Sequence, residues 1–361
     1  MKATQELYDL GQSLWLDNIT RDLLESGTLK RYIDEFSITG LTSNPTIFEH
    51  AIANSKSYDE EIGRLTSKGL SGEELFFELA LQDLTRAADL FTPIHERTAG
   101  NDGFVSLEVS PLLAYDASSS SASAIRLHHR ANRPNIFIKI PGTKEGNLAI
   151  EEATTAGAPI NVTLLFSQEH YRASADAYMR GLERRIAHGL SPDVRSVASV
   201  FLSRWDAAVM EKVPDRLRNK LGIAIGQQVY KAYREVLSSD RWQRLSNLGA
   251  RPQRLLFAST GTKDPKASDV LYIGALAAPN TINTIPEKTL LAFADHGTST
   301  GTLPPDGGNC EAVLDDFRKA GIDLDQLAGE LQSNGAKAFD KSWEELLNAI
   351  ESKGKQLTLA S

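Results

Sequence analysis

The sequence is poor in cysteine and has no long apolar run near its start. Cys310 is the one cysteine among 361 residues, so an intramolecular disulfide is excluded, and no Cys/His cluster has the spacing of zinc ligands. Charged and polar residues interrupt every apolar stretch of residues 1–18, which excludes a signal peptide or a membrane span there. We therefore expect a cytoplasmic, metal-free protein in a reducing compartment.

Basic residues are also fewer than acidic ones. The chain has 39 Lys and Arg against 47 Asp and Glu, which gives a formal net charge of −8. Nucleic acids and anionic membranes need a concentrated basic surface, so we expect neither as a partner. Phosphorylated small molecules fit this charge, because one or two cations inside a cleft are enough to bind them.

Short apolar segments alternate along the chain with longer segments of helical periodicity. This alternation is typical of βαβ units around a parallel sheet. Eight segments have strand length: 13–17, 37–43, 104–110, 135–140, 160–166, 196–202, 254–260 and 280–285. The last is the weakest, and 272–276 competes with it. Eight strands with intervening helices predict an α/β fold, a single (β/α)8 TIM barrel.

Helical periodicity dominates the rest of the chain. Helices are predicted between strands at 73–91, 167–188 and 221–239, and after Pro286 at 287–297, 310–321, 324–335 and 337–355. Segment 297–309 is rich in Gly, Pro and Thr and predicts a mobile loop. The part after this loop is short and charged. We therefore interpret residues 1–361 as one domain, with 310–361 as extra helices packed on the barrel and, as a hypothesis, capping its mouth.

Three charged residues lie within apolar strands: Asp17, Glu108 and Lys139. Along 135–140 the alternation places Lys139 on the face opposite the isoleucines, so it points into the barrel if the isoleucines face the helices. The same alternation turns Glu108 and Asp17 toward that interior. All three are near the carboxyl ends of their strands, where barrel enzymes keep their chemistry.

These residue types suit chemistry through a lysine imine. A buried amine loses hydration of its charged form, which lowers its pKa and yields the neutral nucleophile that an imine requires. Carbinolamine dehydration needs a proton donor and carbon–carbon cleavage needs a base, and two carboxylates can divide these tasks. Each residue alone is better explained as a snorkelling lysine or a paired strand-end charge. The three together favour catalysis.

Polar residues at other strand ends extend this candidate site. Asn-Pro at 44–45 predicts the end of a strand and the start of a helix with Pro45 in its first turn. Thr42 and Asn44 would then face the barrel mouth. Asn161 and Thr163 form a second polar pair within an apolar strand.

Two further segments offer cations for a phosphate. Ser199 and Arg204 follow one strand, and Ser259 and Lys263 flank a glycine turn after another. A turn of backbone amides with one guanidinium can bind a terminal phosphate. Each cation alone is better explained as a surface charge.

Four segments together resemble transaldolases over about residues 10–300: GLTSNPTIF (40–48), VSLEVSPLLAYD (105–116), NIFIKIPGTKEG (135–146) and INVTLLFS (160–167). The resemblance implies a barrel enzyme without cofactor or metal, with Lys139 as the imine-forming lysine, Glu108 as the catalytic glutamate and Asp17 as the catalytic aspartate. It further implies a set of residues that bind a sugar-phosphate substrate: Asn44, Asn161, Thr163 and Ser199 around the dihydroxyacetone moiety, Thr42 and Thr143 close by, and Arg204 at the phosphate.

The chain departs from many relatives after its seventh strand. Where they carry Ser-x-Arg, this chain has Ser259-Thr260-Gly261-Thr262-Lys263, so Lys263 is the candidate for the second phosphate cation. This version resembles a longer transaldolase subfamily that is sometimes fused to glucose-6-phosphate isomerase. The chain is too short to hold that second enzyme.

The implied reaction belongs to the non-oxidative pentose phosphate pathway. A dihydroxyacetone unit passes from sedoheptulose 7-phosphate to glyceraldehyde 3-phosphate, giving erythrose 4-phosphate and fructose 6-phosphate. Two alternatives stay open: a lyase that releases free dihydroxyacetone through the same lysine, and a non-catalytic barrel whose three charges form a core network. The expected assembly is a monomer or a homodimer.

Overall fold

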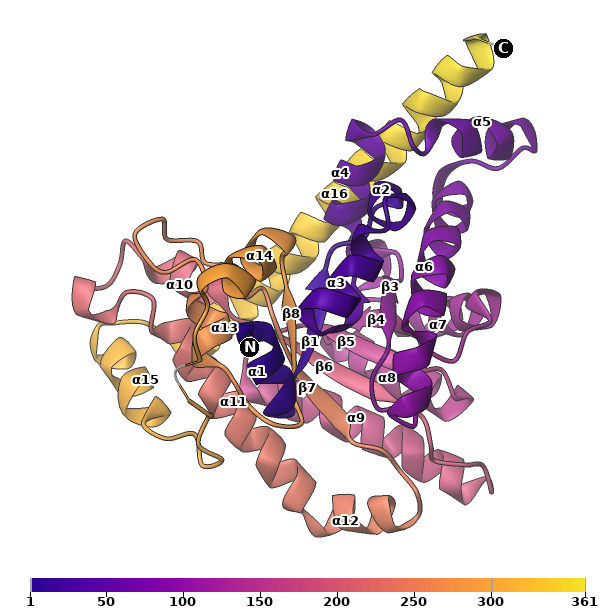
Figure 1. Cartoon of the computed structure of the whole chain (residues 1–361). Helices are drawn as coiled ribbons and strands as arrows, with labels where there is room; N and C mark the ends of the chain where they lie inside the picture. The colour runs from indigo at the N-terminus through magenta and orange to yellow at the C-terminus, as the bar shows by residue number, and fades with distance from the viewer. Residues whose placement is uncertain (1, 300, 361) are drawn as a thin grey trace.

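The computed structural model describes residues 2–299 and 301–360. Within them, parallel strands close into a barrel in chain order, with the last strand pairing with the first (Figure 1). The strands are β1 (Ser13–Asp17), β2 (Ile38–Thr42), β3 (Val105–Glu108), β4 (Ile136–Pro141), β5 (Ile160–Leu165), β6 (Ser196–Phe201), β7 (Gln253–Ala258) and β8 (Ile282–Ile285). The predicted (β/α)8 barrel is confirmed, and β8 rather than 272–276 is its eighth strand.

Helices surround the barrel and connect its strands. Those up to β4 are α1 (Ala3–Asp9), α2 (Arg21–Glu25), α3 (Thr28–Phe36), α4 (Pro45–Asn54), α5 (Asp59–Ser67), α6 (Gly72–Arg97), the 3₁₀ turn η1 (Pro111–Leu113) and α7 (Ala117–Ala131). Those after β4 are α8 (Lys144–Ala156), α9 (Gln168–Ala187), α10 (Ser203–Val209), η2 (Asp215–Leu217), α11 (Leu221–Ser238), α12 (Asp240–Asn247), α13 (Leu271–Ala275), α14 (Glu287–His296), α15 (Cys310–Lys319) and α16 (Leu324–Ala360).

Strand register brings the predicted catalytic residues to neighbouring positions. Glu108 on β3 is paired with Lys139 on β4, which is in turn paired with Asn161 on β5. On the other side of the barrel, Asp17 on β1 is paired with Thr42 on β2. Because paired residues of adjacent parallel strands point the same way, these side chains share one end of the barrel interior.

The predicted break between helices 324–335 and 337–355 is wrong. Helix α16 runs without interruption over 37 residues and passes through Gly335. A Cβ at Gly335 would lie 2.9 Å from Leu164 Cδ2 and 3.0 Å from Arg204 Nη1, so close packing explains the glycine. Glycine is needed here because a side chain would not fit in this contact, and not because the helix ends.

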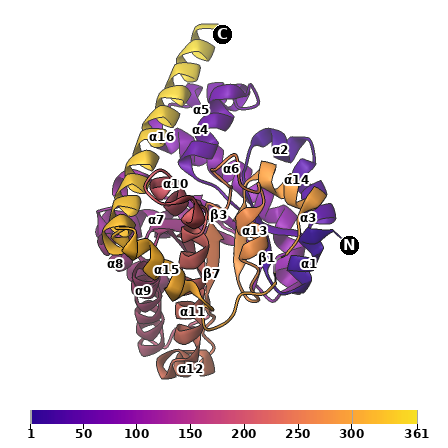
Figure 2. The same ribbon diagram turned by 90° about the vertical axis from the view of Figure 1, so that its left-hand side faces the viewer.

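Helix α16 crosses the carboxyl end of the barrel and then extends beyond it. Its Gln332 side chain donates hydrogen bonds to the carbonyl oxygens of Gly142 and Leu164, each at 3.0 Å, beyond or near the ends of β4 and β5. Farther along, α16 packs on α4, α5 and α6. Figure 2 shows α16 on one side of the barrel and the N-terminus on the other.

The loop at 297–309 and helix α15 precede α16 and contact the barrel helices and loops. Residues 297–299 and 301–309 contain no helix or strand, as predicted, while residue 300 of the predicted loop lies outside the described residues. The loop is anchored by Leu303, which is buried and donates its N–H to the Ala277 carbonyl at 2.8 Å. Helix α15 then packs on α11. No helix within the described ranges has both the length and the apolarity to cross a membrane.

Candidate active site

A cavity of about 270 Å³ lies at the carboxyl ends of the barrel strands. Strand ends, the loops after them and the helices α4, α10 and α16 contribute its walls. Nine of the twelve predicted site residues line it: Asp17, Thr42, Asn44, Lys139, Thr163, Ser199, Arg204, Ser259 and Lys263. Of the other three, Glu108 contacts Lys139 directly, whereas Asn161 and Thr143 are buried behind the cavity wall.

Lys139 is held between two acceptors. Its Nζ donates to Glu108 Oε2 at 3.0 Å and to the Ser43 carbonyl at 2.8 Å, and the residue is only 5% exposed. Glu108 is buried as well, and its Oε1 has no hydrogen-bond partner among the described residues. Burial raises the pKa of Glu108, while the Lys139 charge and hydrogen bond oppose this shift. A protonated Glu108 could therefore pass a proton beside a reacting amine.

Asp17 faces the same cavity from β1. Thr42 donates its hydroxyl to Asp17 Oδ1 at 2.7 Å and also shares a hydrogen bond of 2.6 Å with Thr284. Burial raises the pKa of Asp17, and the Thr42 hydrogen bond and the charges of Lys139 and Lys263 lower it. This balance suits a carboxylate that accepts and returns a proton.

Asn161 acts from behind the wall. Its Nδ2 donates to Ser106 Oγ at 3.1 Å, and its Oδ1 accepts from Ser199 Oγ at 2.7 Å. These two hydrogen bonds link side chains of β3, β5 and β6. Thr163, next along β5, is also buried, and its Oγ1 has no partner within the described part of the chain. A cavity-lining hydroxyl without a protein partner is free to bind a ligand.

Thr143 is engaged elsewhere. Its hydroxyl donates to the Ala114 carbonyl at 2.5 Å and accepts from the Gly146 amide at 2.9 Å, which makes it the N-cap of α8. Both hydrogen bonds hold the loop after β4 in place. Asn44 is likewise an N-cap, accepting from the Ile47 amide at 3.1 Å, but it also lines the cavity.

The far side of the cavity is cationic. Arg204 begins the first turn of α10, and no carboxylate in the described ranges lies within ion-pair distance of its guanidinium. Burial lowers the pKa of Arg204, with the Glu108 charge opposing this shift. Lys263 lies in the loop after β7, where Ser259 adopts a left-handed φ of 54° and its Oγ lies 2.9 Å from Ser203 Oγ. Two cations without carboxylate partners suit an anionic substrate end.

A family model described as transaldolase/fructose-6-phosphate aldolase matches residues 14–350. The chain belongs to this family. Three relatives named transaldolase are similar over nearly their whole length. They come from Saccharopolyspora erythraea (43% identical over 353 residues, 96% of each chain), Thiobacillus denitrificans (44% over 358 residues, 97% of this chain and 100% of the relative) and Thermobifida fusca (44% over 355 residues, 96% of each chain).

The match confirms the resemblance seen in the motifs and extends it past residue 300. It includes most of α16, which belongs to the C-terminal segment predicted, as a hypothesis, to cap the barrel mouth. Phe339 of α16 lines the cavity, together with Thr46, Ile47 and His50 of α4, none of which was predicted. Helical periodicity marks these positions as one face of a helix, but it gives no sign of which surface that face meets.

The other lining residues that were not predicted include two in strands and one directly after a strand. Thr284 lies two residues after Ile282 in β8, so the strand alternation that singled out Lys139 does not single out Thr284. Phe201 and Pro286, at the ends of β6 and β8, complete the wall. No group of His, Cys, Asp and Glu that could hold a metal occurs within the described residues of this transaldolase-family chain.

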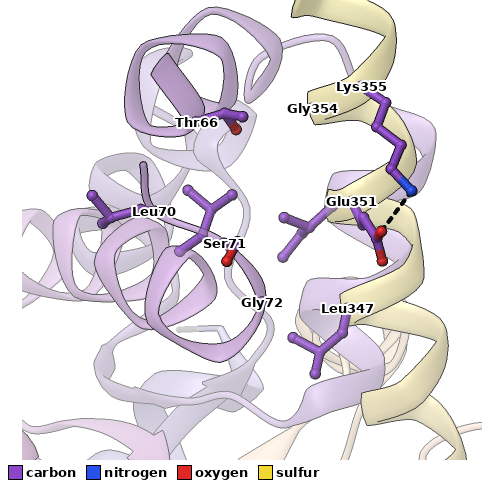
Figure 3. A pocket seen from close by; sticks show the side chains of 10 residues that line it. Thr66, Leu70, Ser71, Gly72, Leu347, Glu351, Gly354 and Lys355 are labelled. Atoms are coloured by element: carbon purple, nitrogen blue, oxygen red, sulfur yellow. Dashed lines mark ion pairs between the residues drawn. The ribbon is translucent and has the colours of Figure 1, made fainter. Parts of the chain in front are cut away.

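A larger cleft of about 800 Å³ lies away from the barrel mouth. Figure 3 shows Leu70 and Ser71, near the start of α6, facing Leu347 and Glu351 on α16. Its lining is mostly apolar, and the Glu351–Lys355 ion pair of 2.6 Å lies on exposed side chains. It offers neither a buried nucleophile nor a cation without a carboxylate partner among the described residues, so the smaller cavity is the better candidate for the active site.

Proposed function

We propose that Lys139, Glu108 and Asp17 catalyse the transaldolase reaction of this chain. The observation that carries this assignment is the buried Lys139 amine, held by Glu108 and the Ser43 carbonyl beside the same cavity as Asp17. Lys139 is the nucleophile because it alone of the three can form an imine. The substrates are sugar phosphates, whose terminal phosphate lies against Arg204 and Lys263.

In the first half of the reaction, the Lys139 amine adds to the C2 carbonyl carbon of sedoheptulose 7-phosphate. Glu108, 3.0 Å from this amine, transfers the protons that convert the carbinolamine hydroxyl into water, and water leaves as the imine forms. Asn161 lies on the strand next to Lys139 and accepts a hydrogen bond from Ser199. The Asn161–Ser199 pair and the unpartnered Thr163 hydroxyl hold the hydroxyls of the three-carbon unit.

Asp17 then accepts the proton of the C4 hydroxyl. The electron pair of the C3–C4 bond moves into the protonated imine, so erythrose 4-phosphate leaves as an aldehyde and an enamine stays on Lys139. The enamine carbon attacks the carbonyl carbon of glyceraldehyde 3-phosphate, and Asp17 returns its proton to the new hydroxyl. Water hydrolyses the imine and releases fructose 6-phosphate.

Borohydride trapping tests the nucleophile. The protein is incubated with fructose 6-phosphate, reduced, and mapped by peptide mass, with Lys139→Ala treated in parallel. We expect a three-carbon adduct on the peptide containing Lys139 and none in the variant. An adduct on another lysine, or none in the unmodified chain, would overturn the assignment.

Omission of the acceptor separates transfer from release. A transferase holds the enamine until an aldehyde phosphate arrives, so fructose 6-phosphate alone should give a single turnover. Continuous release of dihydroxyacetone without acceptor would identify a lyase that uses the same lysine. Quench-flow measurement of glyceraldehyde 3-phosphate distinguishes the burst from the steady rate.

Three expectations from the sequence complete this proposal. We place the enzyme in the cytoplasm, consistent with its single cysteine, and as a monomer or homodimer; cell fractionation and light scattering test these points. We also treat residues 310–361 as part of one domain, because α16 and α15 bury apolar residues in the same cluster as the barrel. A stable 310–361 fragment after limited proteolysis would contradict the single domain.

A further inference from the structure

The guanidinium of Arg204 is held by packing rather than by charge. Its central carbon lies 5.2 Å from the ring centroid of Phe201 and 5.8 Å from that of Phe339. Within residues 2–299 and 301–360 it has no ion-pair partner and no hydrogen-bond acceptor. An arginine whose donors are all free needs another means to stay in one position, and aromatic faces supply it through cation–π contact.

One of the two rings comes from a distant part of the chain. Phe201 is the last residue of β6, three positions before Arg204, but Phe339 belongs to α16 and is 5% exposed. Phe339 and Arg204 both line the cavity, so the ring lies beside the guanidinium in the cavity wall.

Gly335 lies one helical turn before Phe339 on the same helix, and its backbone packs close to the Arg204 guanidinium. Since a Cβ at this position would stand 2.9 Å from Leu164 Cδ2 and 3.0 Å from Arg204 Nη1, any side chain here would displace these side chains or the helix. Two links fix α16 on either side of this contact. Gln332 binds the carbonyls of Gly142 and Leu164, and Ser342 shares a hydrogen bond of 2.8 Å with Thr46 of α4.

We propose that Phe339 and Gly335 are positioning residues: they fix the Arg204 guanidinium in the place where it binds the terminal phosphate of the substrate. This inference rests on the proposed function and adds a part of the site that lies 200 residues beyond Lys139. It gives α16 a specific task in discriminating phosphorylated from unphosphorylated sugars. Neither residue touches the reacting carbons, so the chemical steps at Lys139 do not depend on them directly.

The test compares matched substrates rather than total activity. For each variant, kcat/KM is measured with fructose 6-phosphate and fructose as donors, and with glyceraldehyde 3-phosphate and glyceraldehyde as acceptors. Phe339→Ala should lower kcat/KM for the phosphorylated member of each pair by about tenfold, because the cation–π contact is lost. Values for the unphosphorylated member should change by less than about twofold.

Gly335→Ala is the sharper variant, because alanine favours the helix and does not weaken its fold. The added methyl group displaces Arg204, and we expect a loss of about tenfold confined to phosphorylated substrates. The inhibition constant of inorganic phosphate should rise by the same factor. Phe339→Leu, which keeps an apolar side chain, should give an intermediate loss and guards against misfolding of Phe339→Ala.

Gly329→Ala is the matched control on the same helix. Gly329 is exposed, and a Cβ there would meet nothing within 4 Å, so this variant gains helix propensity without touching the site. It should keep every kcat/KM value. Equal losses for phosphorylated and unphosphorylated substrates, or no loss at all, in Phe339→Ala and Gly335→Ala would overturn the inference.

Failure of the proposed function would look different. If Lys139 is not the nucleophile, the unmodified chain itself gives no adduct on that residue. If only the present inference fails, the unmodified chain still traps on Lys139, and the variants keep the original preference for phosphorylated substrates.

Discussion

The two ends of the barrel interior both bury charge, but they treat it differently. At the amino end, Asp102 accepts hydrogen bonds from Trp15 Nε1 at 2.8 Å and from Ser13 Oγ, and Arg254 donates to Ser13 Oγ and to backbone carbonyls. At the carboxyl end, one oxygen of Glu108 has no partner in the described structure. At the amino end Arg254 Nε is the member of this cluster that lacks a partner among the described residues, whereas at the carboxyl end an oxygen of Glu108 and the Thr163 hydroxyl, both beside the cavity, lack one.

This difference separates charges that stabilise the fold from charges that await a substrate. An unpaired buried polar group costs stability, so a fold retains one where a ligand will satisfy it. Mutations at the carboxyl end should therefore change activity with little loss of stability. Mutations at the amino end should do the reverse.

The largest expected effect is on catalysis at the carboxyl end. Asp17→Asn keeps the hydrogen bond from Thr42 but removes the base, so kcat should fall on the order of 10³-fold. Imine formation precedes the step that needs this base, and borohydride should then trap the intact six-carbon ketose on Lys139. The free energy of unfolding should not decrease, because burial already disfavours the Asp17 charge. A three-carbon adduct in this variant would exclude Asp17 as the base.

At the amino end the expected effect is on stability. Asp102→Ala leaves Trp15 Nε1 and Ser13 Oγ without their acceptor, and should lower the free energy of unfolding by about 3 kcal/mol. Urea denaturation measures this loss. Asp102→Asn, which keeps one acceptor oxygen, should lose less. The folded fraction of both variants should keep normal kcat, and a tenfold fall would show that the two ends are coupled.

The smallest expected effect is on the pH dependence of kcat and concerns the hydrogen bond from Thr42 to Asp17 at the carboxyl end. Burial raises the pKa of Asp17 and the Thr42 hydroxyl lowers it, so Thr42→Val should raise this pKa further. Since Asp17 acts in its deprotonated form, the acid limb of the kcat profile should move to higher pH. Thr42→Ser keeps the hydroxyl and should leave the limb in place. An unmoved limb in Thr42→Val would assign it to another group.

Much of the barrel could be predicted because its strands are fully buried and parallel. Such strands appear as short apolar runs, and a charge within one of them, such as Lys139, is conspicuous. The catalytic set follows from alternation along single strands. The structure brings Lys139 and Glu108 together as expected, while the roles of both stay predictions until the trapping experiment.

The rest depended on contacts that no local pattern contains. Gly335 was interpreted as a helix end because isolated glycine weakens helices, yet the tertiary contact with Arg204 explains it. Likewise, helix α6 continues through Pro93 to Arg97, beyond the predicted end at 91. Phe339 is an ordinary buried aromatic residue by periodicity, and only the packing of α16 on the barrel places it at the cavity.

The position of Phe339 also has a consequence for synthesis of the chain. Phe339 follows Lys139 by 200 residues, so at ~5–20 residues per second the ribosome adds it roughly 10–40 s later. In the last part of that interval, once β8 has been made up to Ile285, the barrel that holds Lys139 and its carboxylates can close, while one wall of the proposed phosphate site does not yet exist. A nascent chain therefore has no complete means of retaining a sugar phosphate, and the competence of the enzyme is set by one of its last-made helices.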